Sequence, residues 1–347
     1  GRGLPFFQGN ADFGRLHPAV RVWCSEPTKI AHTGDILISV RAPIGAMNVA
    51  DQDCCIGRGL AAIRVNENIC DPQYLWYAIQ SKVSDLNVKG TGSTFKAISK
   101  STLTDTEVLL VPLDAQKNIA SVLSNVENSI LFRKEQLTKL DELIKARFVE
   151  MFGTYPDNPF GWNTGKIQDV VSNVRYGSSR PAVEGGKYPY LRMNNITYAG
   201  ELDLTDTKRI DVPDSELDKC TVQRGDVLFN RTNSKELVGK TCVYNRDDMM
   251  VLAGFVIRVR VNERILPEFL VAFLNTAFSK QMLLGMCKTA IGQANINAKE
   301  MQNIGLYIPP IALQEQFVDL KKQTDKSKLL AELFAQSTCI LAENRSK

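Results

Sequence analysis

A duplicated order of short motifs constrains this chain more than any other feature of its sequence. The pattern Gly-Asp-aliphatic-Leu stands at residues 34–37 and again at residues 225–228, an offset of 191. Four further matches follow in the same order, and their offset never exceeds 198. An order kept with so little drift indicates duplication of one structural unit with small loop insertions. The further matches pair 62–65 with 256–259, 71–75 with 266–270, 98–99 with 296–297, and 112–116 with 310–314.

Each copy predicts the same series of strands and helices. The Gly-Asp turn precedes a β-rich strand, and a second strand is expected near residues 60–65 or 255–261. Pro72 and Pro267 stand where a proline opens an amphipathic helix in its first turn. The motifs therefore predict a unit that mixes a small sheet with a covering helix.

The second half of each copy predicts a loop, a short strand and a proline. The loop is rich in small polar residues, at 90–94 in the first copy and at 289–293 in the second. Short strands are then expected at 107–111 and 304–308. A long helix is expected after the proline that ends each strand.

The first long helix is the clearest secondary-structure prediction. No Pro or Gly occurs from Asp114 to Phe152, and apolar residues recur at steps of three and four. At 1.5 Å per residue this helix would be about 55–60 Å long, more than a single domain requires. The second helix begins at Ile311. Its apolar seam contains Leu313, Phe317, Leu320, Leu330, Leu333 or Phe334, and Leu341.

Two seams of similar length in one chain favour helices that pack against each other. The alternative is two separate amphipathic helices, each lying on its own domain. The sequence leaves both arrangements open and favours the paired one.

Composition excludes several classes of protein. A chain of 347 residues with 44% hydrophobic residues can bury two cores, so wholesale disorder is not expected. No apolar stretch approaches the roughly 20 residues of a membrane helix, and the first ten residues show no signal pattern. The eight scattered cysteines are expected to be reduced thiols in a cytoplasm. With a net charge of +4, any nucleic-acid contact needs cations clustered on one face.

Taken together, these motifs resemble the DNA-specificity subunit of type I restriction–modification systems. The specific parts are the duplicated Gly-Asp strand, the loop leading to Ile98-Ser99 or Ile296-Asn297, and the P-x-x-x-Q opening of each long helix. The stretch from Arg147 to Gly153, followed by Trp162, resembles the family's passage into its second recognition domain. The match covers nearly the whole chain.

The resemblance implies an α+β fold with two β-rich target recognition domains, joined by two long helices that form an antiparallel coiled coil. It also implies sequence-specific recognition of a bipartite target in double-stranded DNA, with two methyltransferase subunits and, in the full nuclease, a restriction subunit as partners. S-adenosylmethionine and ATP are then expected only on those partners. The expected division is 1–111 for the first recognition domain, 112–153 for the first spacer helix, 154–309 for the second domain and 310–347 for the second helix.

The two copies begin differently. Residues 4–7 align with residues 188–191, whereas the second copy already starts near Trp162. By this alignment roughly 25–30 residues are expected to be missing before the first copy, as in a fragment or a truncated gene product.

An enzyme is not expected. The only two histidines are His17 and His32, so a histidine base or a His-rich metal site is disfavoured. The Asn158-Pro159-Phe160 stretch faintly resembles a methyltransferase motif but lacks its second proline, and it is better explained as a turn. No Gly-x-Gly-x-x-Gly follows a predicted strand. Chemistry is therefore assigned to partner subunits, and no catalytic or metal-binding residue is predicted.

Polar and cationic side chains on loops are the candidates for contact with DNA, because base reading needs side chains that enter a groove. Arg231 follows its Gly-Asp strand much as Arg41 follows the first one, shifted by one position. For any single residue, a solvated loop position is the favoured explanation, whereas for the set as a whole contact with DNA is favoured. The candidates in the first copy are Ser39, Arg41, Lys89, Thr91, Ser93, Thr94 and Lys96. Those in the second are Tyr176, Ser178, Ser179, Arg180, Arg192, Asn194, Asn195, Asn230, Arg231, Asn233, Lys235, Lys240 and Gln293.

Two alternatives remain open at the level of sequence. One is a truncated specificity subunit that no longer directs modification. The other is a protein-interaction scaffold with a coiled coil and globular heads that does not bind DNA. Tight, salt-sensitive binding to DNA together with methyltransferase subunits would separate them.

Overall fold

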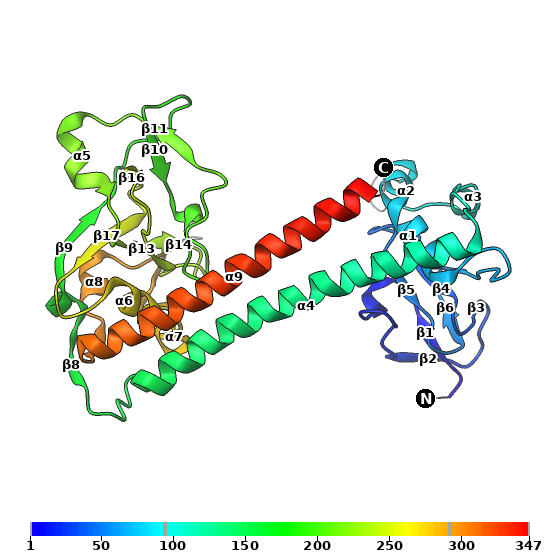
Figure 1. The fold of residues 1–347 in the computed structure, drawn as a ribbon, viewed down its shortest axis with the longest axis horizontal. Helices are drawn as coiled ribbons and strands as arrows, with labels where there is room; N and C mark the ends of the chain where they lie inside the picture. The colour runs from blue at the N-terminus through cyan, green and yellow to red at the C-terminus, as the bar shows by residue number, and fades with distance from the viewer. Residues whose placement is uncertain (1, 93–95, 291–292, 346–347) are drawn as a thin grey trace. The chain divides into compact units, whose positions relative to one another are not determined.

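The structure, a computed structural model, describes residues 2–92, 96–290 and 293–345, and only the backbone of residues 289–290 and 332–345. Its contacts group the chain into two compact units (Figure 1). The first unit comprises Gly1–Phe132 with Ala335–Lys347, and the second comprises Arg133–Phe334. Each unit thus includes part of a long helix, so this grouping leaves the predicted boundaries at 111, 153 and 309 as predictions.

The first unit contains two small sheets. One has the strand order β2-β1-β6-β3 and the other the order β5-β4-β7. Strands β1 and β6 are parallel, whereas the other neighbours run antiparallel. The strands are β1 (Leu4–Phe7), β2 (Val22–Cys24), β3 (Ile30–Ala31), β4 (Ile36–Ser39), β5 (Met47–Val49), β6 (Cys54–Ile56) and β7 (Leu60–Ile63). The helices are η1 (Asn10–Asp12), α1 (Pro72–Ser81), α2 (Val83–Lys89), α3 (Lys100–Thr104) and the start of α4 (Leu113–Phe152).

The second unit repeats both sheets, one with four strands as before and the other enlarged from three strands to four. Its sheets have the orders β11-β10-β16-β12 and β15-β13-β17-β9, and the smaller sheets β14-β19-β18 and β20-β8 are added. The strands are β8 (Asn163–Lys166), β9 (Val171–Tyr176), β10 (Tyr188–Leu191), β11 (Lys208–Ile210), β12 (Thr221–Val222), β13 (Val227–Asn230), β14 (Thr232–Asn233), β15 (Thr241–Val243), β16 (Met250–Leu252), β17 (Val256–Val261), β18 (Lys288–Ala290), β19 (Gln293–Asn295) and β20 (Gly305–Ile308). The helices are η2 (Ile167–Val170), η3 (Met193–Asn195), α5 (Asp214–Cys220), α6 (Pro267–Leu274), α7 (Ala277–Met286), α8 (Ala298–Gln302) and α9 (Ile311–Arg345).

The strand pairing explains the Gly-Asp motif of each copy. Gly34 and Gly225 have φ angles of +89° and +91°, a conformation that favours glycine. The next residue, Asp35 or Asp226, is buried and accepts a backbone N–H that closes the turn. Its carboxylate also pairs with an arginine of the neighbouring segment, Arg64 directly after β7 or Arg260 within β17.

These arginines correct one of the sequence matches. Arg64 binds Asp35 at 2.9 Å, and Arg260 binds Asp226 at 2.8 Å. The strand register agrees, because β4 pairs Ile36 with Ile63 while β13 pairs Val227 with Val259. Residues 62–65 therefore correspond to 258–261 and not to 256–259. The error arose because residues 256–261 repeat a similar pattern of aliphatic residues and arginine two positions apart.

The glutamine of the first P-x-x-x-Q motif is a structural tie. Gln116 is fully buried near the start of α4. Its Oε1 accepts the backbone N–H of Asp71 at 2.8 Å. Its Nε2 donates to the carbonyls of Ile69 and Val111 at 3.0 and 2.7 Å. The side chain thus joins the residues before α1 to the start of the long helix.

Gln314 makes the same set of contacts at the start of α9. Its Oε1 accepts the backbone N–H of Leu266 at 2.8 Å. Its Nε2 donates to the carbonyls of Arg264 and Pro309 at 3.2 and 2.8 Å. The predicted helices at Pro72, Pro267, Asp114 and Ile311 are all confirmed, each starting within one residue of the expected position.

Within the second unit, the end of α4 and the start of α9 pack side by side in opposite directions. Phe148 contacts Phe317 edge to face, with ring centroids 5.2 Å apart. Further along, Asp141 forms an ion pair with Lys328. Residue numbers fall on one helix as they rise on the other, which is the predicted antiparallel pairing. Leu330, expected in the seam, is largely exposed.

Two local predictions are wrong. Residues 107–111 form no strand, whereas the matching β20 pairs with β8 in the second unit. A strand needs a neighbour for its backbone groups, and none of the described strands of the first unit lies beside this segment. The expected loop at 289–293 is instead occupied by the ends of β18 and β19, which pair antiparallel; its residues 291–292 lie outside the described part of the chain.

Among the described residues, no single helix has the length and apolar character needed to cross a membrane. Helices α6 and α7, bent by 71° where they meet, reach the required length and composition only as a pair.

Candidate nucleic-acid interface

One group of predicted contact residues in the second unit surrounds the end of strand β13. Arg231 follows this strand, and the planar end of its side chain lies 4.9 Å from the ring centre of Tyr176, which ends β9. Strand β14 then begins and pairs Asn233 with Ala294 of β19. Gln293, in the same strand, is exposed. The fold therefore brings four predicted residues from three strands and one turn together.

Serines and an exposed aromatic ring border this group. Ser178 forms a bridge with Ala253, and its carbonyl accepts the backbone N–H of Gly254 at 2.7 Å. Ser179 is exposed, and so is the ring of Phe255. Because Arg231 also reaches toward the carbonyl of Gly254, these residues lie next to the first group. An exposed edge of polar groups and rings is the kind of surface that can enter a groove or stack on a base.

Sequence reasoning missed Asn295, which organises this surface. Its Nδ2 donates to Thr232 Oγ1 at 2.8 Å, and its Oδ1 lies 3.4 Å from Nη2 of Arg231. The signal that could have found it is its place in the repeat: it stands at the position of Ala97, next to the Ile296-Asn297 motif.

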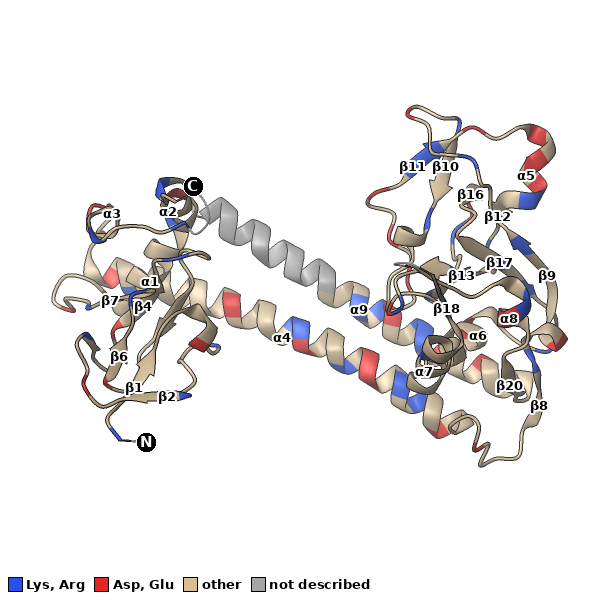
Figure 2. Cartoon of the chain, turned by 180° about the vertical axis from the view of Figure 1, so that it is seen from behind, with Lys and Arg blue, Asp and Glu red and all other residues tan. Residues whose placement is uncertain are grey.

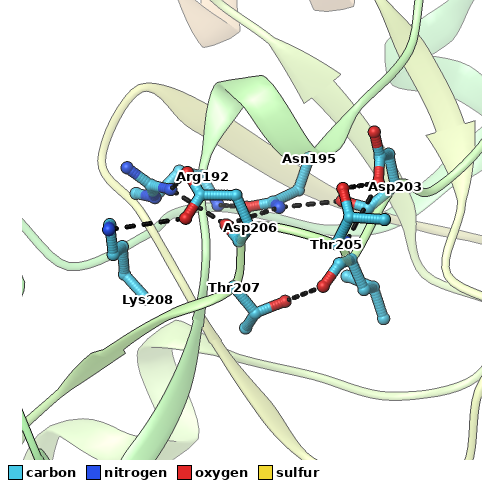
Figure 3. Close-up of polar contacts among 8 residues, drawn as sticks. Arg192, Asn195, Asp203, Thr205, Asp206, Thr207 and Lys208 are labelled. Atoms are coloured by element: carbon cyan, nitrogen blue, oxygen red, sulfur yellow. Dashed lines mark hydrogen bonds and ion pairs between the residues drawn. The ribbon is translucent and has the colours of Figure 1, made fainter.

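A second group of predicted residues forms a network of hydrogen bonds (Figure 3). Arg192 binds the carboxylate and the carbonyl of Asp206 at 2.9 and 3.0 Å. Asn195 is buried, and its amide accepts from Arg192 and donates to the carbonyls of Asp203 and Asp206. Lys208 shares the Asp206 carboxylate at 3.4 Å. These contacts hold the loop that leads into β11, while Asn194 stays exposed.

Several predicted contact residues already have partners inside the unit. Arg180 is paired with Glu216 of α5 at 2.7 Å. Lys240 is buried and donates to the carbonyl of Met193 at 2.9 Å, and burial lowers the pKa of its amine. The Asn230 side chain is fully buried, and neither of its polar atoms has a hydrogen-bond partner among the described residues. Lys235 lies exposed in the loop after β14.

The first unit places a smaller group around one bridge. Ala97 pairs with both Arg41 and Thr91, so the turn after β4 and the loop after α2 meet there. Arg41, Lys96 and Thr91 are exposed, whereas Ser39 is buried and donates to the Arg41 carbonyl at 2.7 Å.

Exposed Lys89 ends α2 in the same unit. Ser93 and Thr94 lie outside the described residues. The contact predictions for all these residues stay predictions.

Charges of both signs are spread over the described surface. Figure 2 shows blue and red segments side by side along α4, and a mainly red α5. Helix α5 carries Asp214, Glu216 and Asp218 against a single lysine. An acidic helix repels phosphate, so the cationic groups at Arg231 and Arg41 are better placed for DNA. Among the described residues, no group of three His, Cys, Asp or Glu side chains is arranged to hold a metal ion.

Comparisons with known proteins agree on one family. The family model described as "Type I restriction modification DNA specificity domain" matches residues 25–142 and 159–334, one match for each copy of the repeat. The chain is 37% identical over 145 residues to the putative type I restriction enzyme MjaX specificity subunit of Methanocaldococcus jannaschii, covering 42% of this chain and 34% of that protein. It is 23% identical over 255 residues to the EcoKI specificity subunit of Escherichia coli, covering 69% and 54%. The chain thus spans about a third to about half of these relatives' lengths.

Solved structures share the fold. A chain from a structure on complex assembly and conformational transition of the type I R-M system matches with a TM-score of 0.62 at 17% identity, covering 98% of this chain and 89% of that one. The crystal structure of the type I restriction–modification S subunit from M. genitalium matches with a TM-score of 0.58 at 15% identity, covering 99% and 87%. Since the family model matches both copies of the repeat, the chain belongs to the type I restriction modification DNA specificity domain family.

Proposed function

We propose that this chain is the non-catalytic component that reads DNA sequence for a type I restriction–modification system. Each unit reads one half of a bipartite target in double-stranded DNA. Two methyltransferase subunits carry S-adenosylmethionine and modify the target, and in the full nuclease a restriction subunit that uses ATP cuts DNA. The observation that carries the proposal is the family match over both copies of the repeat.

Three features of the units support a DNA partner. Each unit presents polar and cationic side chains after its Gly-Asp strand, around the exposed Arg41 in one and the half-buried Arg231 in the other. In the repeated motifs, Gln116 and Gln314 form hydrogen bonds within their own units. The exposed turns beside these motifs can therefore differ in sequence between the units. A shared frame with different loops suits two readers of different half-sites.

Mapping of methylated bases tests the proposal. The gene is expressed together with genes for type I methyltransferase subunits, and base modifications are sequenced across the host genome. We expect a bipartite methylated motif with an unread gap, which disappears when this gene alone is deleted. Purified complex should bind a duplex carrying that motif with an affinity that falls steeply as salt rises. Methylation that persists without this gene would contradict the proposal.

A further inference from the structure

The backbone holds Arg231 at a fixed position between two strands. Its own N–H donates to the carbonyl of Phe255 at 3.0 Å, and its carbonyl accepts the N–H of Ile296 at 2.9 Å. One neighbour lies just before β17 and the other just after β19. These two hydrogen bonds therefore fix the backbone of Arg231, and so they define the position from which its side chain extends.

The guanidinium group of Arg231 is oriented without being fully used. It lies over the Tyr176 ring, and the Tyr176 hydroxyl is itself anchored by accepting the N–H of Ala298 at 2.9 Å. Its two terminal nitrogens lie 3.5 Å from the Gly254 carbonyl and 3.4 Å from Asn295 Oδ1. Both distances exceed the usual 2.7–3.2 Å of a good N–H···O bond. Stacking and two weak contacts thus aim the group and leave its two terminal amino groups available, whereas Nε is buried without a hydrogen-bond partner among the described residues.

The charge of Arg231 is also left without a carboxylate. Other arginines of the second unit form ion pairs, as Arg192 does with Asp206 and Arg224 with Asp247. Within the part of the chain that the structure describes, no carboxylate lies within 4.0 Å of Arg231. The side chain that Arg231 contacts here is the neutral amide of Asn295, which supplies no negative charge to balance the guanidinium.

The first unit shows that the fold does not need an arginine here. Val40 makes the same two backbone bonds, donating to the carbonyl of Gly59 and accepting from Ile98, as Arg231 makes with Phe255 and Ile296. Strand register agrees, because Ser39 and Asn230 are the last residues of β4 and β13. A valine is thus sufficient for these two backbone bonds, so the turn does not require the arginine side chain.

We propose that Arg231 is a specificity-determining residue that binds the O6 and N7 atoms of a guanine in the half-site read by the second unit, and that Tyr176 and Asn295 are its positioning residues. This rests on the proposed function. A guanidinium only donates, and guanine offers two adjacent acceptors in the major groove. Adenine presents a donor beside its N7, and cytosine presents a donor, so neither accepts both N–H groups.

Four variants of the full chain, expressed with its methyltransferase subunits, test the assignment. Arg231→Val copies the first unit and should fold normally. Asn295→Asp keeps the side-chain shape but supplies a carboxylate that captures Arg231. Both should relax one guanine of one half-site to any base and leave the other half-site unchanged. Tyr176→Phe retains the stacked ring and should keep the guanine, whereas Tyr176→Leu should relax it at the same position.

Binding to a modified duplex gives the second measurement. Replacing the identified guanine by 7-deazaguanine removes the N7 acceptor. The unaltered complex should then bind more weakly, up to the roughly 5- to 150-fold that a full bidentate contact contributes, while the Arg231→Val complex should be insensitive to the replacement. An unchanged motif in both Arg231→Val and Asn295→Asp, or relaxation at a base other than guanine, would overturn this inference and leave the proposed function intact. Absence of any motif with the unaltered chain would overturn both.

Discussion

The two units share one arrangement of strands but differ in the further strands that pair with it. Strands β1, β6, β4 and β7 of the first unit have counterparts in β10, β16, β13 and β17 of the second, with the same parallel and antiparallel pairings. In the second unit, β17 also pairs with β9 and β20 with β8. Among the described residues of the first unit, β7 pairs only with β4, and residues 107–111 form no strand. The repeated motifs thus form the strands that both units share. The sheets of the second unit are completed by β8 and β9, which lie outside those motifs.

The burial of matching residues shows what the added strands do. Tyr307 of β20 is 1% exposed, whereas Leu109, at the same place in the repeat, is 75% exposed. Ile167 and Val170, which lie between β8 and β9, are part of the core that covers β17 and β20. A single segment of chain therefore converts an open apolar edge into a closed core.

The largest difference between the units is expected at this edge. Tyr307→Ala removes a buried ring and its hydrogen bond to the carbonyl of Gly153, and should cost about 3–5 kcal/mol of stability in the second unit. Leu109→Ala changes an exposed side chain and should cost no more than about 0.5 kcal/mol in the first. Hydrogen exchange resolved by mass spectrometry reports the opening free energy of each unit separately. Equal costs would show that residues 107–111 are covered in solution.

A smaller difference is expected at the Gly-Asp motifs. Asp226 pairs with Arg260, whose side chain is 30% exposed, whereas Asp35 pairs with Arg64, whose side chain is 62% exposed. Water weakens an ion pair, so Asp226→Ala should destabilise the second unit by about 3 kcal/mol and Asp35→Ala the first by about 1–2 kcal/mol. The same exchange experiment measures both.

Acid provides the control for the first of these motifs. Burial alone would raise the pKa of Asp35, but the hydrogen bonds from Arg64 and from the His32 backbone, with the charge of Arg64, lower it below 3.8. The stabilisation is therefore fully present above pH 3.8 and is lost as the pH falls through the lower folded value. The cost of Asp35→Ala should shrink in that acid range. A cost that is independent of pH would contradict the ion pair.

The sequence could predict the elements that both copies of the repeat share, but not how the strands that complete each sheet would pair. The repeat predicted the helices at Pro72, Pro267 and Ile311 because each depends on a local signal that both copies carry. It failed at residues 107–111 because a strand also depends on a distant partner, which a local pattern does not report. It missed Asn295 because that residue acts through Arg231 and Thr232, which are far away in the sequence. Arg231 itself was found from its place after a strand.

Equal effects are expected where the two units are the same. Gln116→Leu and Gln314→Leu keep the side-chain volume, but each leaves one backbone N–H and two carbonyls without their buried partner. Each should destabilise its own unit by about 2 kcal/mol. Urea unfolding of the two single variants checks the size of the effect, and hydrogen exchange checks that each is confined to one unit. A cost in one unit only would mean that the shared contacts do not carry the shared frame.

The smallest effect is expected at one turn, which an amide side chain holds in the first unit and an amine side chain holds in the second. In the first unit the neutral amide of Asn87 donates to the carbonyl of Ile44 at 3.0 Å, and in the second the amine of Lys280 donates to the carbonyl of Gly239 at 3.2 Å. Burial, and to a lesser extent the charge of Lys240, lowers the pKa of Lys280 to about 8 from 10.5. Below pH 8 the folded protein carries this charge at a cost.

Between pH 8 and 10.5 the folded state releases a proton that the unfolded state retains, so stability should rise with pH. Lys280→Met should therefore be more stable than the native chain at pH 7, by about 1 kcal/mol, and this advantage should shrink by pH 10. Urea unfolding at the two pH values measures the difference. Asn87→Ala is the matched control, because an amide does not titrate and its cost in the first unit should be the same at both pH values. If the advantage of Lys280→Met stays constant with pH, the lysine is not titrating at this turn, and the two units differ there in shape alone.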